Sequence, residues 1–145
     1  MNIDVIIDDK YNNSKIVIYT DKMSDEISHI IDMLKSENNS QLYGFIQDKL
    51  YFLDSQNIFL IYSENGKIFA KTEDNIYQLK YRLYQLEELL DKNFIRISNS
   101  EIINIQKVKS LDFSMLGTIR INFINGTYTF ASRRFIKKIK EYLKI

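Results

Sequence analysis

The stretch TIRINFINGTYTFASRRFIKKIKEYL, residues 118–143, sets the architecture of the C-terminal part of the chain and concentrates positive charge there. Apolar and polar residues alternate on both sides of Asn125-Gly126, a dipeptide typical of two-residue hairpin turns. This pattern predicts antiparallel strands over 118–123 and 127–131. Apolar residues then recur at helical spacing, which predicts a final helix over 133–143.

Short strands are also expected along most of the preceding chain, where apolar runs are bounded by turn residues. Leucines at positions 79, 83, 86 and 90 follow helical spacing and predict a helix over 81–91. Residues 98–104 are expected to form a turn or a short helix. The expected strands are 42–46, 49–53, 58–63, 67–72, 76–79, 94–97 and 107–113. The sequence therefore predicts a β-rich α+β fold with mainly antiparallel short strands and a few helices.

The N-terminal segment has a different pattern. Residues 2–8 and 15–20 are rich in Ile and Val and predict two short strands. Ser24 is a suitable N-cap for a helix whose apolar stripe is Ile27, Ile30, Ile31 and Leu34, and which we expect to end near Leu34. Polar residues follow. We expect residues 1–36 to form a small ββα extension and residues 42–145 to form the main domain.

The composition excludes several kinds of site. A chain of 145 residues suits one domain with a short extension. There is no cysteine, and His29 is the one histidine, so thiolate and multi-histidine metal sites are excluded, and we expect no cofactor. No apolar run approaches the roughly 20 residues that span a bilayer, and the N-terminus lacks a signal pattern. We expect a soluble, cytoplasmic protein.

The sequence also lacks the common motifs of catalysis. It contains no GxGxxG, GxxxxGK[ST] or GxSxG pattern. Paired carboxylates such as Glu87 and Glu88 are adjacent in sequence, so they project in different directions and suit a solvated face better than acid–base chemistry. We expect neither enzymatic activity nor a small-molecule substrate.

The net charge of +1 hides a strong asymmetry along the chain. Residues 1–93 hold 10 basic and 16 acidic residues, a balance of −6, whereas residues 94–145 hold 10 basic and 3 acidic residues, a balance of +7. Such a local positive field favours a polyanionic partner. The alternative is a basic surface balanced by an acidic one across the same fold.

The predicted final helix carries much of this charge. Arg133, Lys137, Lys140 and Lys144 lie at helical spacing and form one basic stripe, which Arg134 and Lys138 flank. The two arginines lie in the first turn, where the positive end of a helix disfavours them, so a functional role gains weight. Arginine can contact guanine or phosphate, and a helix start with Ser132 as N-cap can offer N–H groups to phosphate.

A second polar patch follows the expected strand 94–97. Alternation places Ile97 inward and Arg96 outward, and Ser98, Asn99 and Ser100 continue as a polar loop. Asparagine can pair with adenine and serine can contact bases or phosphate. The simpler interpretation is an ordinary turn capped by Ser and Asn side chains.

These motifs together resemble the LytTR DNA-binding domain over about residues 42–145. The resemblance rests on Phe94, Arg96, Ser98–Ser100, Ile103-Asn104, Val108–Phe113, Asn125-Gly126 and Ser132-Arg133-Arg134, in the family's order and spacing. It implies a compact β-rich fold that reads the DNA major groove with loops, without a helix-turn-helix recognition helix. Ser98 stands where many members carry His.

The resemblance also implies where DNA would bind. The contact regions would be Glu64–Lys67, Ser98–Ser100 and the start of the last helix, with Arg134 as the best-matched arginine. The expected DNA-binding residues are Lys67, Arg96, Ser98, Asn99, Ser100, Ser132, Arg133, Arg134, Lys137 and Lys138. The N-terminal extension is too short for a receiver domain of about 100 residues, and it resembles the heads of stand-alone LytTR proteins, which often accompany a small membrane protein.

We therefore expect a sequence-specific, double-stranded DNA-binding transcription regulator. The apolar stripe of the extension suggests that it acts as a homodimer, and a membrane-protein regulator is a further expected partner. One alternative is a non-catalytic protein-interaction module that binds a partner protein, for example a membrane protein, through its charged surfaces. RNA binding is a third hypothesis, which exposed aromatic rings would favour.

Overall fold

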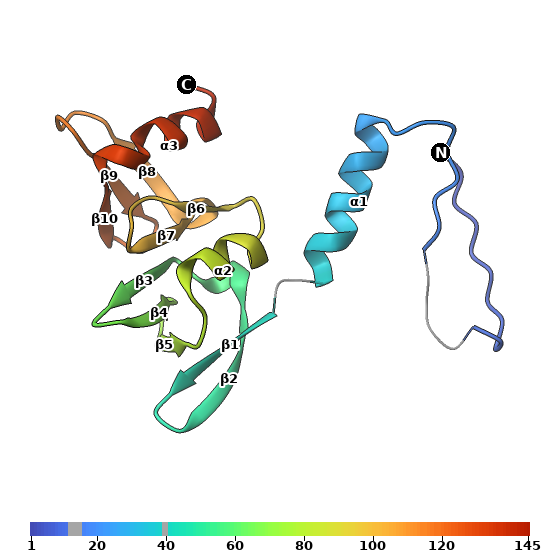
Figure 1. Ribbon diagram of the computed structural model, residues 1–145, viewed down its shortest axis with the longest axis horizontal. Coiled ribbons are helices and arrows are strands. Elements are labelled where there is room, and N and C mark those ends of the chain that lie inside the picture. The colour runs from blue at the N-terminus through green and yellow to red at the C-terminus, as the bar shows by residue number, and fades with distance from the viewer. Residues whose placement is uncertain (12–15, 39–40) are drawn as a thin grey trace.

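The computed structural model describes residues 1–11, 16–38 and 41–145. In these ranges it has three α-helices, three 3-10 helices and ten strands (Figure 1). The helices are α1 (Asp25–Asn38), η1 (Ser55–Asn57), α2 (Leu83–Leu89), η2 (Ile105–Lys107), η3 (Arg133–Phe135) and α3 (Ile136–Leu143). The strands are β1 (Gln41–Ile46), β2 (Lys49–Asp54), β3 (Leu60–Glu64), β4 (Lys67–Lys71), β5 (Ile76–Leu79), β6 (Phe94–Arg96), β7 (Glu101–Asn104), β8 (Val108–Asp112), β9 (Ile119–Phe123) and β10 (Tyr128–Ala131).

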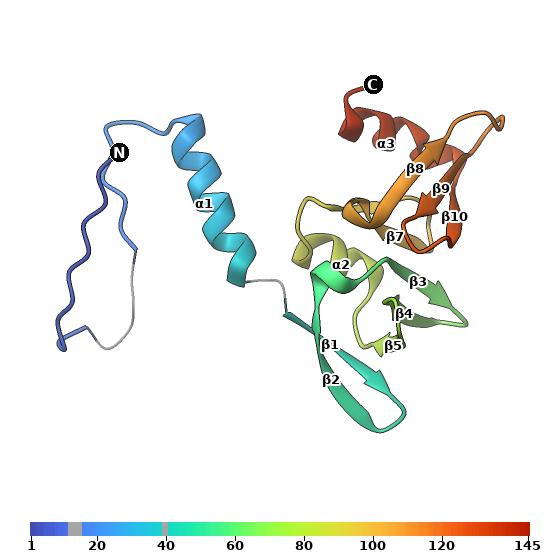
Figure 2. The same ribbon diagram turned by 180° about the vertical axis from the view of Figure 1, so that it is seen from behind.

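The strands form two sheets. One has seven strands in the order β2-β1-β5-β4-β3-β7-β6, and the other has three in the order β10-β9-β8. Every ladder between the described strands is antiparallel. Helix α2 lies over the larger sheet and α3 beside the smaller one (Figures 1 and 2). The expected β-rich, mainly antiparallel α+β fold is confirmed.

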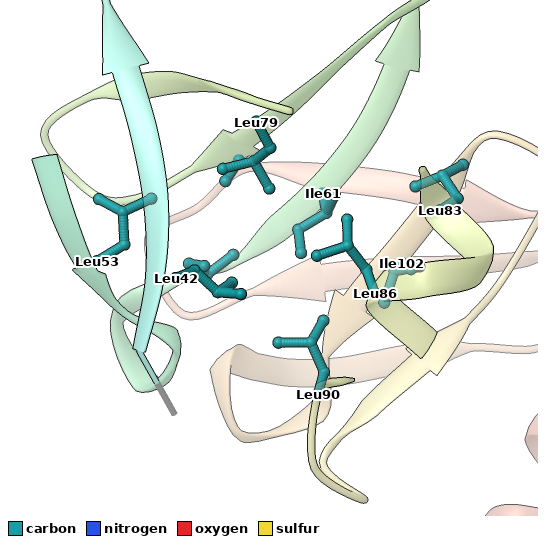
Figure 3. Packing of buried hydrophobic residues seen from close by; sticks show 10 residues of the cluster. Leu42, Leu53, Ile61, Leu79, Leu83, Leu86, Leu90 and Ile102 are labelled. Carbon is teal, nitrogen blue, oxygen red and sulfur yellow. The ribbon is translucent and has the colours of Figure 1, made fainter. Parts of the chain in front are cut away.

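Each sheet has its own apolar core. Leu83, Leu86 and Leu90, on and just after α2, pack toward Ile61 and Ile102 of the larger sheet (Figure 3), as the leucine spacing predicted. In the second core, Ile119 and Ile121 of the smaller sheet pack with Ile139 of α3. This second core also includes Ile95 of β6, Ile97 just after β6, and Ile103 of β7. Because β6 and β7 belong to the larger sheet, the second core joins the two sheets.

A buried asparagine fixes one of the connections between elements. Asn104 is 1% exposed at the end of β7. Its Nδ2 donates to the carbonyl of Ile58 at 3.0 Å, and its Oδ1 accepts the N–H of Gln106 at 3.1 Å, which caps η2. A buried amide that is satisfied in this way costs little, whereas an unsatisfied one destabilises a fold.

Strand β7 was not predicted from the sequence. Residues 98–104 were expected to form a turn or short helix, but Glu101–Asn104 form β7, which pairs with β3 and β6. Ile102 and Ile103 are both buried because each face of this inner strand is covered. The strand therefore lacks the alternation that reveals a half-exposed strand.

The N-terminal extension differs from the expected ββα unit. Residues 1–11 and 16–24 form no strand, so the strands expected at 2–8 and 15–20 are wrong for the described residues; residues 12–15 lie outside them. The hydroxyl of Ser24 does accept the N–H of Ile27 at 3.3 Å, as expected for an N-cap, and α1 continues to Asn38, past the expected end at Leu34. In both views α1 lies apart from the sheets (Figures 1 and 2). No described helix is long and apolar enough to cross a bilayer.

Candidate nucleic-acid interface

Two backbone hydrogen bonds bring the three expected contact regions together. We name them the β3–β4 turn (Glu64–Lys67), the β6–β7 loop (Ser98–Ser100) and the η3 segment (Ser132–Arg134). The N–H of Ser63 donates to the carbonyl of Ser100 at 2.8 Å, and the N–H of Ser132 donates to the carbonyl of Ile97 at 2.9 Å. The β6–β7 loop therefore lies between the other two segments.

The β3–β4 turn is a two-residue hairpin turn. Asn65 and Gly66 have φ values of 51° and 77°, and Glu64 pairs with Lys67 across the strands. Positive φ at both central positions is the backbone that an Asn-Gly pair favours. Lys67 is exposed at the turn. Tyr62 of β3 stacks on the ring of Phe69 with centroids 5.4 Å apart, which supports the base of the turn.

The β6–β7 loop is held from beneath by Arg96. Its Nε donates to the carbonyl of Ser98 at 2.7 Å, and its Nη2 donates to the carbonyl of Asn99. Its Nη1 lies 2.6 Å from Oε1 of Glu87 on α2, and the Arg96 side chain is only 17% exposed. Arg96 was expected to face DNA, but the structure occupies its guanidinium with the protein's own carbonyls and a carboxylate.

The tip of this loop faces solvent. Asn99 and Ser100 are exposed, whereas Ser98 is half-buried and its Oγ accepts the N–H of Ser100 at 3.2 Å. The side-chain amide of Asn99 has no hydrogen-bond partner among the described residues, so its Nδ2 donor and its Oδ1 acceptor are both open to a ligand. The buried side chain of Ile97 anchors the start of the loop, as alternation predicted.

The η3 segment differs from the expected first helical turn. Ser132 has the backbone of an N-cap, and its carbonyl accepts the N–H of Phe135 at 3.0 Å, but its hydroxyl makes no capping hydrogen bond. The expected side-chain cap by Ser132 is therefore wrong. Arg133 and Arg134 lie in η3, before α3 begins, and both are exposed.

The two arginines have different surroundings. A Cβ added to Gly117 would lie 3.0 Å from Nη2 of Arg133, so this guanidinium rests against the backbone of the β8–β9 connection. Gly117 has a φ of 77° and leaves the space that the guanidinium uses. Arg134 makes no hydrogen bond or ion pair with a described residue. The Arg133 guanidinium makes no hydrogen bond or ion pair with a described residue either, so both guanidiniums are open to a ligand, and that of Arg133 also lies against Gly117.

The expected basic stripe is shorter than the spacing suggested. Lys137 and Lys138 are exposed near the start of α3, and Ile139 is buried beneath them. Lys140 lies with its Nζ 5.9 Å from the ring centroid of Phe113. Lys144 follows the helix in a left-handed conformation with a φ of 59°, so it does not continue the helical stripe.

The arrangement suits the binding of a nucleic acid. Exposed cations can neutralise phosphates, and an open amide and guanidinium can pair with base edges. The described residues contain no cluster of three or more His, Cys, Asp or Glu side chains that could hold a metal ion. Sequence reasoning missed the roles of Glu87 and Gly117, because each acts on a residue that is distant in the chain and belongs to another element.

Comparisons with known proteins identify the family of this chain. The LytTr DNA-binding domain family matches residues 48–144. Two Staphylococcus aureus proteins, from strains MSSA476 and MW2, are each 34% identical over 146 residues, covering 100% of this chain and 99% of each relative. Both are described as uncharacterized HTH-type transcriptional regulators.

A solved LytTr DNA-binding domain from Bacillus cereus has the same fold. Its TM-score is 0.70 at 21% sequence identity, over 73% of this chain and 98% of that domain. In the described part of this chain, strands β1–β5 separate α1 from α2 and strands β6–β10 separate α2 from α3, so no two α-helices follow each other across a short turn. The family match over two thirds of the chain establishes that this chain belongs to the LytTR DNA-binding domain family.

Proposed function

We propose that this chain is a transcription regulator that binds double-stranded DNA at specific sequences and reads the major groove with its loops. The observation that carries the proposal is that the Ser63–Ser100 and Ser132–Ile97 backbone bonds join three polar segments, each of which carries exposed side chains. Loops held in a fixed relation can meet successive bases in one groove. The separation of the helices by strands favours loops over a recognition helix as the reading element.

The residues divide into two proposed roles. Asn99 and Arg134 read base edges, because their polar groups are open and lie on neighbouring segments. Lys67, Arg133, Lys137 and Lys138 contact phosphates and set the register, with Ser98 and Ser100 adding hydrogen bonds at the loop. Arg96 and the backbone of Ser132 support the surface from behind, because their donors are already used within the protein.

Fluorescence anisotropy tests this proposal directly. The full chain is titrated into a labelled duplex from upstream of its own coding region and into a shuffled duplex, at several salt concentrations. A sequence reader binds the native duplex more tightly, and its affinity falls steeply as salt rises. Equal or absent binding to this and other candidate promoter duplexes would contradict the proposal and favour a protein-interaction module, which a pull-down that survives DNase treatment would identify.

We also propose that the regulator acts as a homodimer. Half-sites in DNA commonly match two-fold protein symmetry. Helix α1 lies apart from the sheets and carries an apolar stripe, in which Ile27 is 8% exposed and Ile30, Ile31 and Leu34 are half-buried. Sedimentation of the full chain would reveal a dimer. A clean monomer at high micromolar concentration would contradict this part of the proposal, and a membrane-protein partner would then be sought for the stripe.

A further inference from the structure

Strand β2 is an exposed, apolar edge of the seven-stranded sheet. It lies at one end of the strand order and pairs only with β1 among the described strands. Leu50 is 47% exposed, Tyr51 37% and Phe52 66%. Such an edge offers unpaired backbone groups together with apolar side chains, which is a template for another strand. Natural sheets usually protect such an edge with charges, prolines or a covering element, and β2 carries a charge only at its two ends.

The hairpin geometry shows which backbone groups of β2 are open. Ile46 and Lys49 flank a two-residue turn whose first residue, Gln47, has a φ of 53°. In such a hairpin the flanking pair is hydrogen-bonded, and alternate residues along the strand turn their N–H and C=O away from the partner. Leu50 and Phe52 therefore direct their backbone groups toward the open edge.

A strand-forming segment without a partner occurs in the same chain. We call residues 3–8, Ile-Asp-Val-Ile-Ile-Asp, the N-terminal arm. The composition predicted a strand here, yet the arm makes no ladder within the described chain, and its large apolar side chains are exposed, with Ile7 at 94%. An isolated strand cannot satisfy its backbone groups or bury its side chains, so the predicted strand requires an edge that the described chain does not supply to it.

We propose that the arm of one copy adds to the β2 edge of a second copy as an antiparallel strand. This inference rests on the homodimer proposed above and gives that dimer a contact in addition to the apolar stripe of α1. One register matches both the open backbone groups and the charges: it places Asp8 opposite Lys49, Ile7 opposite Leu50, Ile6 opposite Tyr51 and Val5 opposite Phe52. The apolar pairs lie in the middle and an opposite-charge pair lies at one end, which is the arrangement that stabilises paired strands. Within one chain, Oδ2 of Asp8 lies 3.8 Å from Nζ of Lys10. Both side chains are well exposed, so this ion pair is weak and can be replaced by one between Asp8 and Lys49.

The position of α1 favours exchange between copies. Its 14 residues hold Asp25 about 20 Å from the helix end that leads to β1, at 1.5 Å per residue. The arm lies beside this helix, on the side that faces away from the sheets, in both views (Figures 1 and 2). A helix that carries the arm outward suits delivery to a neighbour, and exchange of identical elements is a common route to symmetric dimers.

The absence of cysteine from the chain permits a direct test by disulfide formation. Ile6→Cys and Tyr51→Cys are purified separately in the full chain, mixed and oxidised. Opposed residues of antiparallel strands have Cα atoms about 4.5–5.5 Å apart, which a disulfide can bridge. We expect a dimer that peptide mapping assigns to a 6–51 bond. Ile6→Cys mixed with Ile124→Cys is the matched control, because Ile124 is comparably exposed but follows a strand of the other sheet.

A double variant distinguishes exchange from folding back. With Ile6→Cys and Tyr51→Cys in one chain, exchange gives a disulfide-linked dimer, whereas folding back gives a cross-linked monomer. A 6–51 bond confined to single chains, or no bond above the Ile124→Cys control, would overturn the proposal.

Sedimentation gives a readout without engineered cysteines. Phe52→Lys adds a charge at the proposed contact, and we expect at least a tenfold weaker dimer than for Ile124→Lys. DNA binding is measured in parallel on the labelled upstream duplex and on the shuffled duplex. Loss of the dimer with a retained preference for the upstream duplex leaves the DNA-binding proposal intact, whereas a cross-linked dimer that binds no duplex would reject DNA binding while keeping the arm. An unchanged dimer affinity in Phe52→Lys would contradict the proposed pairing of the arm with β2.

Discussion

Arg96 and Glu87 form an ion pair with Nη1 and Oε1 2.6 Å apart, and this pair ties β6 to α2 beneath the β6–β7 loop. The remaining guanidinium nitrogens hold the carbonyls of Ser98 and Asn99. The planar guanidinium suits this task because it presents several donors in a fixed fork, which lysine cannot reproduce. A residue that sequence pattern assigns to the DNA face therefore sets the shape of the loop that carries Asn99.

Removal of Arg96 should reduce the preference for the target sequence, while the electrostatic attraction to any DNA should change little. We expect Arg96→Ala to weaken binding to the target duplex by about 1–3 kcal/mol, the range of one good base contact, because Asn99 loses its position. Binding to the shuffled duplex and the salt slope should stay near wild type. Glu87→Gln should act in the same direction with a smaller effect. A salt slope that falls by about 1 in Arg96→Ala would instead show that Arg96 contacts a phosphate.

Arg134 and Lys137 should separate base reading from phosphate contact. We expect Arg134→Ala to lose about 1–3 kcal/mol on the target duplex and to relax the preference at one base position. Lys137→Ala should weaken binding to all duplexes alike and reduce the salt slope by roughly 1. Anisotropy titrations at several salt concentrations measure both quantities. Equal losses on target and shuffled DNA for Arg134→Ala would reject its reading role.

Gly117 should matter through its contact with Arg133. Gly117→Ala and Gly126→Ala both place a side chain at positive φ, 77° and 86°, so each should destabilise the fold by about 1–2 kcal/mol. Only the Cβ at position 117 meets the Arg133 guanidinium, whereas no atom lies within 4 Å of one at Gly126. We therefore expect the thermal melts of the two variants to be similar and only Gly117→Ala to weaken DNA binding. Similar binding by both variants would show that the Arg133 position is unimportant.

Ionisation of Tyr62 should lower the stability of the folded protein at alkaline pH. Burial, and to a smaller extent the nearby Glu64 carboxylate, raise the pKa of Tyr62 above its ordinary value of 10.0. The unfolded chain then ionises first as the pH rises, so the stabilisation is present below pH 10 and is lost as the pH rises through the folded pKa.

The ultraviolet absorbance of tyrosinate measures this pKa as the difference between wild type and Tyr62→Phe. Glu64→Gln should lower the Tyr62 pKa only in part, because burial is the larger cause. Tyr84→Phe is the control, since Tyr84 is well exposed on α2. A Tyr62 that ionises together with the exposed tyrosines would contradict the prediction.

The parts of the fold that sequence could predict are those with a local signal. The hairpin expected around Asn125-Gly126 and the helix expected from the leucines of α2 are confirmed, because a turn dipeptide and a helical period are local patterns. The hairpin loop has three residues, Ile124–Gly126, instead of two, and only Gly126 among them has a positive φ. Strand β7 was missed because both of its faces are covered by distant elements. The strands expected at 2–8 and 15–20 have the right composition, but pairing depends on an available edge, which composition does not encode.

The sequence predicts the segments of the candidate site but not the surroundings of its side chains. Family motifs name the segments that contain Asn99 and Arg134, and the structure joins those segments. The motifs do not show that the Arg96 guanidinium is already used, or that the Ser132 hydroxyl makes no cap, because both depend on the direction of a side chain or a carbonyl. Whether these residues contact DNA stays a prediction.

The two bonds that join the three loops use main-chain atoms alone. Any amino acid other than proline at Ser63 or Ser132 can donate the same bond, and the carbonyls at Ile97 and Ser100 are present whatever side chains stand there. The relative position of the three segments therefore does not depend on which side chains they carry. At the proposed interface, Asn99, Ser100 and Arg134 can be exchanged while the spacing between them persists, so we expect point changes to alter the DNA sequence that is bound without rebuilding the fold that presents these residues.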